Sequence, residues 1–432
     1  MTGAARNLRV AVIGAGWAGL AAAVEATRAG AQATLFEMAT EPGGRARALG
    51  GRTADEDLLD NGQHICIGAY VETLRLMATV GVAEADAFLR LPLTLVDVAG
   101  KGLRLGAGAP LPAFALAVLR RRGWRWRDRL ALLRLAAAWK QQGFRCAPEA
   151  TVAELCAALP LPVREGFIEP LCVAALNTPY GEASATVFLR VLNDALTAGP
   201  GSSDLLLPRL DLVALFPAPA LAWLQRAGAA VRMGRRVMAI DAASDGTWSV
   251  DGLAFDRVVV ATSAVEAARL VDPVAPAWAA QAAALRYEPI VTVYARSAGC
   301  RLPEPMLTLH ADGDRPAQFV FDRGRLGGPA GLLALVASGA SAWLERGLAD
   351  TERAAIAQAQ HDLAPYLHAP LLPVRTVVEK RATFACTPAL ARPPAAVAPG
   401  VLAAGDYVEG PYPATLEGAV RSGVTAARAA TA

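Results

Sequence analysis

The pattern of apolar and polar positions at the start of the chain predicts a strand, a tight turn and a helix, in that order. Residues 8–13 form a short apolar run rich in β-branched side chains, which is typical of a parallel strand buried on both faces. Glycines stand at positions 14, 16 and 19, and the apolar residues 20–26 that follow predict a helix. A second strand is expected over residues 33–36, and Glu37 ends it.

This order of elements is typical of a dinucleotide-binding unit, and a glycine-rich turn without a ligand is the simpler alternative. Gly14 permits the tight turn, Gly16 lets the backbone approach a pyrophosphate, and Gly19 allows close packing of helix and strand. The N-terminus of the helix offers free N–H groups to the phosphates. An acid at the end of the second strand binds ribose hydroxyls and repels a 2′-phosphate, which argues against NADP. The predicted cradle comprises Gly14, Ala15, Gly16, Ala18, Gly19 and Glu37.

A second glycine pair follows the acid. Gly43, Gly44 and Arg45 come directly after Glu41 and Pro42. Two glycines and an arginine at this distance suggest a second loop folded over the pyrophosphate, with Arg45 pairing its charge.

Later apolar runs predict further strands of the same domain. Residues 228–240 are expected to form a strand with a turn at 235–237 inside it, and residues 247–250 and 255–262 two more. Near the end of the chain, a buried strand is expected to end at Gly405 and Asp406. A helix is then expected to start within residues 413–423.

Two insertions separate these segments. Residues 76–214 are mostly helical in pattern. Residues 281–394 alternate short strands with a helix near 351–363, capped from Asp350. The predicted strands of that insertion cover 290–295, 318–321, 332–337 and 374–384. We therefore expect an α/β protein with a discontinuous Rossmann-like domain (1–75, 215–280 and 395–432) and an α+β substrate domain (76–214 and 281–394) that carries the helical insertion.

Composition narrows the class of protein. The 432 residues are 54% hydrophobic and 19% charged, which excludes a largely disordered chain. The most apolar long window, residues 205–224, contains three prolines, Arg209 and Asp211, so no membrane span is expected. The N-terminus has no apolar segment typical of a signal peptide, and a cytoplasmic protein is expected.

Charge and metal ligands exclude two further classes. The net charge of +3 is small for a nucleic-acid-binding protein of this length. The six cysteines contain no C-x-x-C pair, and the four histidines do not cluster with them, so no metal site is expected.

One local stretch, residues 114–145, combines basic and aromatic side chains. It contains nine basic residues between Arg120 and Arg145, one acid, Asp128, and three interleaved tryptophans. Such a stretch is typical of a surface that docks on an anionic membrane. The alternative is a solvated helix face in an arginine-rich protein.

The glycine and arginine pattern resembles the FAD-binding signature of the flavin amine oxidase and carotenoid desaturase superfamily. The resemblance implies FAD as the cofactor and an amine-oxidase-like or phytoene-desaturase-like fold. It also implies that residues 60–64 lie beside the flavin ring, that the Val237 backbone meets the adenine, and that Asp406 holds the ribityl–phosphate region. The further residues that it assigns to the cofactor are Gly62, Gln63, His64, Gly405, Thr415 and Leu416.

More closely, the chain resembles the squalene-associated FAD-dependent desaturase family. The closer signals are residues 60–64 (Asp-Asn-Gly-Gln-His) and residues 379–384 (Glu-Lys-Arg-Ala-Thr-Phe). The resemblance implies reductive removal of the hydroxyl group of hydroxysqualene, which gives squalene in a bacterial route to hopanoids. The reductant that supplies FAD with electrons is not identified by it.

Such a reaction needs a proton donor to the leaving oxygen and a pocket that excludes water. The candidates for the donor are His64, Glu288, Tyr287 and Tyr407. His64 is equally well explained as a packed core residue, and Glu288 as a residue at a strand end.

Other functions remain open at this point. A desaturase would move hydride in the opposite direction, from an apolar isoprenoid to oxidised FAD. A non-catalytic flavoprotein subunit of a terpenoid pathway assembly would bind FAD without turnover. An amine oxidase is disfavoured, because residues 285–290 (Leu-Arg-Tyr-Glu-Pro-Ile) lack the lysine that these enzymes often carry there.

Overall fold

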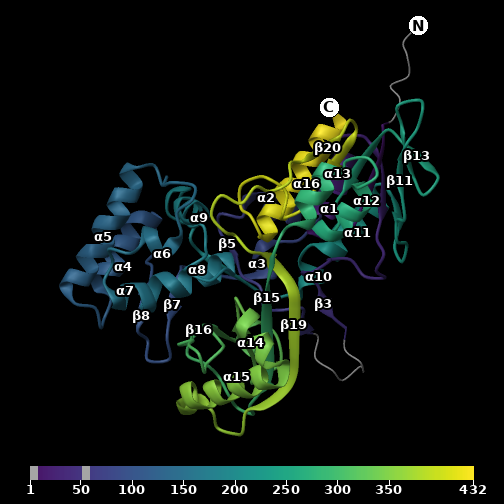
Figure 1. Ribbon diagram of the computed structural model, residues 1–432. Coiled ribbons are helices and arrows are strands. Elements are labelled where there is room, and N and C mark those ends of the chain that lie inside the picture. The colour runs from purple at the N-terminus through teal and green to yellow at the C-terminus, as the bar shows by residue number, and fades with distance from the viewer. Residues whose placement is uncertain (1–7, 51–58) are drawn as a thin grey trace.

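The computed structural model describes residues 8–50 and 59–432, which form an α/β architecture around two sheets (Figure 1). The first is a six-stranded sheet in the order β10-β2-β1-β14-β21-β20. All neighbours in it are parallel except the edge pair β20 and β21. Its strands are β10 (Ala230–Arg232), β2 (Gln32–Phe36), β1 (Arg9–Ile13), β14 (Arg257–Val260), β21 (Val401–Ala403) and β20 (Ala396–Ala398).

Both faces of this sheet are covered, which is why β1 is apolar at successive positions. Val10 and Val12 pack with helices α1 (Trp17–Arg28), α11 (Pro217–Arg226) and α16 (Leu416–Thr431). Ala11 and Ile13 point to the other face. That face is covered by the small sheet of β11 (Ile240–Ala242), β12 (Trp248–Val250) and β13 (Leu253–Phe255), and by α12 (Ala264–Val271) and α13 (Pro276–Ala283).

The second sheet is antiparallel, in the order β16-β17-β18-β15-β19. Its strands are β16 (Met306–Thr308), β17 (Phe319–Asp322), β18 (Leu332–Ala337), β15 (Tyr287–Arg296) and β19 (Leu372–Phe384). One face packs against α15 (Leu348–Asp362), through Val291 and Val293 among others. The opposite face carries Phe319, Phe321 and Val336. Strands β15 and β19 run from the parallel-sheet half into this part of the molecule (Figure 1).

The helices of the first insertion gather to one side of the molecule (Figure 1). They are α4 (Pro110–Arg120), α5 (Trp126–Gln141), α6 (Val152–Leu155), α7 (Leu161–Val163), a π-helical turn (Arg164–Ile168), α8 (Glu169–Leu176) and α9 (Ala185–Thr197). Phe114, Trp124, Leu132 and Trp139 are buried among them.

The remaining elements are short connections around the two sheets. The strands are β3 (Ala48–Leu49), β4 (Leu59–Asp60), β5 (Cys66–Ile67), β6 (Phe88–Leu91), β7 (Thr94–Val96), β8 (Gly102–Arg104) and β9 (Leu205–Pro208). The helices are α2 (Val71–Thr79), α3 (Glu84–Ala87), α10 (Leu212–Leu215) and α14 (Ser341–Arg346), with 3₁₀ turns at Arg323–Leu326 and Ala364–Tyr366.

Two local predictions from the sequence were wrong. The expected strand over 228–240 ends at Arg232, because a turn with Gly234 at φ +68° follows and the backbone stays irregular up to β11. Helix α15 begins at Leu348 with Gly347 as its N-cap, so Asp350 lies in its first turn and does not cap it. The 76–214 insertion is mostly helical, as expected, and it also contains the short strands β6, β7, β8 and β9.

Two global features complete the fold. Within the described parts of the chain, no helix combines the length and apolar character needed to cross a membrane. The same residues contain no group of three or more His, Cys, Asp or Glu side chains placed to hold a metal ion.

Candidate functional site

A cavity of about 460 Å³ lies where the two sheets meet. On one side it is lined by the carboxyl ends of β1, β2 and β14 and by the start of α1, the region where open α/β sheets bind ligands. On the other side it is lined by one face of the antiparallel sheet. The cavity therefore joins a nucleotide-type site to a second, more apolar compartment.

The first glycine loop, at residues 14–19, lets other atoms come close to its backbone. Gly14 has φ +110°, and a Cβ there would lie 2.5 Å from the carbonyl oxygen of Ala261. Gly19 packs against the same turn, since its Cβ would lie 1.8 Å from the Gly14 oxygen. Gly16 is the N-cap of α1, and no side chain caps this helix end. The N–H groups at the start of α1 are thus available to an anion.

The second loop lies directly on the first. The Gly43 N–H donates to the Ala15 oxygen at 2.8 Å, and a Cβ on Gly44 would come within 3.2 Å of the Gly16 Cα. Gly43 and Gly44 both have positive φ values, +116° and +63°. Glycines in both loops therefore allow two backbone segments and a ligand to share one narrow space.

Glu37 lines the cavity at the end of β2 and is already tied to this cradle. Its two carboxylate oxygens accept hydrogen bonds from the backbone N–H groups of Ala15 (2.6 Å) and Ala39 (2.8 Å). These bonds hold an acidic group beside the glycine loop, where the ribose of a dinucleotide would lie.

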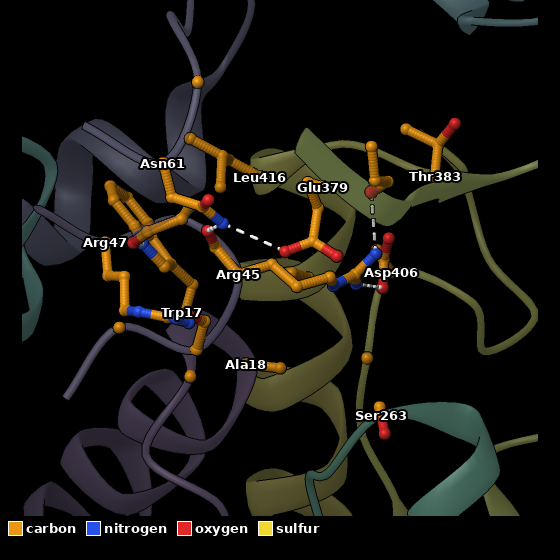
Figure 2. A pocket seen from close by; sticks show the side chains of 18 of the residues that line it. Trp17, Ala18, Arg45, Arg47, Asn61, Ser263, Glu379, Thr383, Asp406 and Leu416 are labelled. Carbon is orange, nitrogen blue, oxygen red and sulfur yellow. Dashed lines mark hydrogen bonds and ion pairs between the residues drawn. The ribbon is translucent and has the colours of Figure 1, made fainter. Parts of the chain in front are cut away.

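Arg45 and Asp406 form an ion pair on the cavity wall (Figure 2). The pairing of Arg45 with a pyrophosphate, expected from the sequence, stays a prediction. In the structure the Arg45 guanidinium pairs with Asp406 and donates to the Ala382 oxygen at 2.8 Å. The arginine charge is thus matched within the chain. Beside it, the Asn61 amide donates to a carboxylate oxygen of Glu379 at 2.9 Å (Figure 2).

The segment of residues 60–64 is held from several sides. The Asp60 carboxylate accepts from the Leu212 N–H at 2.9 Å and lies 3.7 Å from the Arg323 guanidinium. Arg323 also donates to Oε1 of Gln63 at 3.0 Å. Burial raises the pKa of Asp60 to about 6, although Arg323 and the Leu212 N–H act against this rise.

His64 lines the cavity, and its Nδ1 lies 3.0 Å from the Gly62 oxygen. Because a carbonyl oxygen can only accept, this contact assigns the proton of the neutral ring to Nδ1 and leaves Nε2 as an acceptor. Burial lowers the pKa of His64, and the positive charge of Arg45 acts in the same direction. The ring is therefore neutral at neutral pH.

The structure does not bring the other proton-donor candidates to the cavity lining. Glu288 accepts a hydrogen bond from Ser341 at 2.9 Å, because the pairing of β15 with β19 shifts register between Glu288 and Ile290 and breaks the alternation of side chains. Tyr407 is buried against Trp278. Tyr287 also lies outside the lining.

Most of the predicted cofactor residues do line the cavity: Gly14, Gly16, Ala18, Glu37, Gly43, Gly44, Arg45, Gly62, Gln63, His64, Val237, Gly405, Asp406, Thr415 and Leu416. Ala15 and Gly19 do not, and both act through the backbone packing of the first loop. The Val237 oxygen accepts from Arg269 at 2.9 Å. Thr415 is the N-cap of α16, which places the start of a second helix at the cavity.

Sequence reasoning expected a substrate side but did not identify the residues that form the wall of the second compartment. Its wall consists of alternate residues of β15 and β17 and their neighbours on β18 and β19: Ile290, Thr292, Phe319, Phe321, Val336 and Val377. The β-branched run at residues 290–293 could have indicated a strand, and with it a sheet face formed by alternate residues. It could not have indicated that this face looks toward the glycine loops, which depends on packing between distant segments.

Together, the two glycine loops, the acid at the end of β2 and the uncapped start of α1 fit an adenine dinucleotide. The fold and this site define an FAD-dependent oxidoreductase. The chain belongs to the flavin-containing amine oxidoreductase family, whose family model matches residues 17–431.

Relatives with assigned names agree with this class. The chain is 28% identical over 446 residues to a hydroxysqualene dehydroxylase of Rhodopseudomonas palustris, with 97% of each chain covered. It is 27% identical to a hydroxysqualene dehydroxylase of Sinorhizobium fredii at the same coverage.

Solved structures share the fold at lower identity. An oxidoreductase from Methanosarcina mazei matches with a TM-score of 0.73 and 14% identity, covering 98% of this chain and 100% of that one. Cyclohexylamine oxidase from Brevibacterium oxydans matches with a TM-score of 0.71 and 17% identity, covering 98% and 99%.

Proposed function

We propose that this protein reductively removes the hydroxyl group of hydroxysqualene to give squalene, as a step of bacterial hopanoid biosynthesis. The observation that carries the proposal is the apolar compartment that opens from the dinucleotide cradle, where phenylalanine, valine and isoleucine side chains form the wall. A hydrocarbon chain with one hydroxyl group suits such a wall. The similarity to two hydroxysqualene dehydroxylases supports the same substrate.

FAD would be held by residues of the cradle. The proposed contacts are the glycine loops at 14–19 and 43–45 for the pyrophosphate, Glu37 for the ribose and Val237 for the adenine. Asp406 would hold the ribityl–phosphate region, and residues 62–64, Thr415 and Leu416 the flavin. Reduced FAD, when bound, supplies a hydride to carbon.

The overall change is R–OH plus a hydride and a proton, giving R–H plus water. The carbon–oxygen bond breaks, a carbon–hydrogen bond forms, and the leaving oxygen takes the proton. The apolar wall excludes water, which would otherwise recapture the electron-poor carbon. Loss of hydroxide is easier when a donor protonates the oxygen as it leaves.

Of the candidate donors, His64 lines the cavity and remains our proposal for this step. Its pKa lies below the ordinary value, so the ring must be protonated before it can donate. If His64 is the donor, the rate of a single turnover rises as the pH falls toward that pKa. An unchanged rate and pH profile in His64→Ala removes it from the mechanism.

The reaction itself is tested by anaerobic incubation of the photoreduced protein with hydroxysqualene. We expect squalene to form in step with reoxidation of the flavin, read from the visible spectrum. Oxidised protein that instead desaturates an isoprenoid would establish the reverse hydride transfer. FAD binding with no isoprenoid-dependent change of the spectrum would favour a non-catalytic flavoprotein. Either result would contradict the proposal.

We further propose that the 114–145 region contacts the cytoplasmic face of the membrane, from which an apolar substrate would enter. Leu116 and Trp126 are 45% and 63% exposed, Leu119 between them in the chain is also exposed, and Leu161 is exposed elsewhere in the helical insertion. Six arginines of this region are also exposed, and four of them stand close together along the chain: Arg120, Arg122, Arg125 and Arg127. Apolar and basic side chains on one surface suit an anionic lipid headgroup layer.

The structure reduces the set of side chains in residues 114–145 that could contact a membrane. Trp124 and Trp139 are buried in the helical core, so Trp126 carries the aromatic contribution. Arg121 stacks 4.2 Å from the Trp124 ring, and Arg129 donates to the Leu119 and Arg121 oxygens. These two arginines stabilise the fold and do not belong in a membrane-binding test.

The test is co-sedimentation with vesicles that contain phosphatidylglycerol. Serine at positions 120, 122, 125 and 127 should lower partitioning by about 100-fold or more, at about 1 kcal/mol for each arginine near an anionic surface. The matched control places serine at four exposed basic positions elsewhere: Lys101, Arg226, Arg301 and Arg375. Equal partitioning of the two variants would refute the contact.

A further inference from the structure

One hydroxyl group interrupts the apolar wall of the substrate compartment. Thr292 lies in the middle of β15 and is 1% exposed. Its strand neighbours are Val336 on β18 and Val377 on β19, which flank it on the same face. Neither valine side chain can donate or accept a hydrogen bond.

The Thr292 Oγ1 is buried and has no hydrogen-bond partner among the residues that the structure describes. Asn177, another polar side chain of the cavity lining, is by contrast fully engaged within the protein. Asn177 donates to the Glu288 oxygen and to Thr383, and accepts from the Gly339 N–H. A buried hydroxyl without a partner destabilises a fold, which indicates a role other than packing.

The hydroxyl faces the segment predicted to lie beside the flavin. A Cβ on Gly62 would lie 3.6 Å from the Thr292 Oγ1, in ordinary van der Waals contact, and no other described atom outside residues 61–63 would come within 4 Å of it. The Thr292 hydroxyl therefore lies next to the Gly62 backbone, where the dinucleotide cradle passes into the apolar compartment.

We infer that Thr292 makes the hydrogen bond to the hydroxyl group of the substrate and thereby positions the carbon–oxygen bond at the cofactor. The inference rests on the proposed function, because it assumes an apolar substrate with one hydroxyl group. Thr292 is a positioning and specificity residue: it selects an isoprenoid alcohol over the hydrocarbon of the same skeleton.

Binding to the oxidised holoenzyme tests this without turnover. Hydroxysqualene and squalene, and farnesol with the triene hydrocarbon that lacks only its hydroxyl group as a shorter pair, are titrated while the flavin spectrum is followed. The unmodified protein should bind each alcohol about threefold to tenfold more tightly than its hydrocarbon, as one neutral hydrogen bond provides. Thr292→Val should abolish this difference, and Thr292→Ser, which keeps the hydroxyl, should restore it.

Two further measurements, FAD content and melting temperature, distinguish a positioning role of Thr292 from a structural one. Thr292→Val should keep its FAD content and show an unchanged or higher melting temperature without ligand, because a methyl group replaces an unpartnered hydroxyl. A lower melting temperature, lost FAD, equal binding of alcohol and hydrocarbon by the unmodified protein, or no binding of either pair would overturn the inference. If the binding difference follows Thr292 but no squalene forms, the proposed reaction fails while the inference stands.

Discussion

The pair of Asp60 and Arg323 beneath the cavity allows a prediction with a definite magnitude. Both side chains are nearly fully buried, with 3.7 Å between carboxylate and guanidinium. Burial raises the pKa of Asp60 from its ordinary value of 3.8 to about 6 even in the presence of Arg323. An acid whose pKa is raised on folding does not lower the free energy of unfolding below pH 3.8, where it is protonated in both states. The cost grows as the pH rises through this window and is complete above about pH 6.

At about 1.4 kcal/mol for each pH unit between the two pKa values, the full cost in the unmodified protein is about 3 kcal/mol. The substitution Arg323→Met removes the attraction that holds the pKa of Asp60 down. The pKa of Asp60 then rises further, and folding at pH 8 loses about 1.4 kcal/mol more for each pH unit of that further rise. At pH 5 the extra loss is close to zero, because the folded form of either protein already holds the proton.

The assay is urea unfolding of the FAD-saturated proteins at pH 5 and pH 8, with the same free FAD concentration because bound ligand adds to stability. Loss of packing and of the bond to Gln63 lowers stability at both pH values and cancels in the comparison. Asp60→Asn combined with Arg323→Met is the control, and its pH-dependent part should vanish. An equal loss for Arg323→Met at both pH values would refute the reasoning.

Three other predictions test the cofactor half and the thiols. Gly423→Ala would place a Cβ 2.1 Å from a backbone oxygen of α1, so its melting temperature should fall by several degrees, while Gly106→Ala, with open space around it and no positive φ, should be neutral in the same thermal scan. Glu37→Ala should weaken FAD binding at least about tenfold in a fluorescence titration, through loss of charged hydrogen bonds, and the exposed Glu41→Ala should not. Cys146 should react first with a thiol reagent at pH 8, because the five other cysteines are buried and burial raises their pKa to about 11 or 12. Six thiols that react at one rate in the folded protein would contradict this.

The local architecture of the cofactor half could be predicted from the sequence alone. The turn at Gly14, the start of α1 and the acid at the end of β2 lie next to one another along the chain, so short-range sterics and hydrogen bonding determine them. The buried strands were recognisable for the same reason, since sheets covered on both faces require continuous apolar runs.

The substrate side could not be predicted in this way. Glu288 was a reasonable candidate as a carboxyl group near an apolar pocket, but a register shift between β15 and β19, strands about 80 residues apart in the chain, turns it toward Ser341. The sequence suggested that Trp124 and Trp139 contact a membrane, but both side chains are buried in the helical core. Thr292 gave no signal in the sequence, because an unpartnered hydroxyl can be recognised only when its neighbours in space are known.

The sequence by itself determined the cofactor class and the order of the strands and helices that bind it, because these depend on contacts between residues close along the chain. The tertiary structure decided which side chains face the cavity, which charges pair across it, and where its apolar wall lies. Those features depend on strand register and on packing between segments hundreds of residues apart, as in the pair of Arg45 and Asp406.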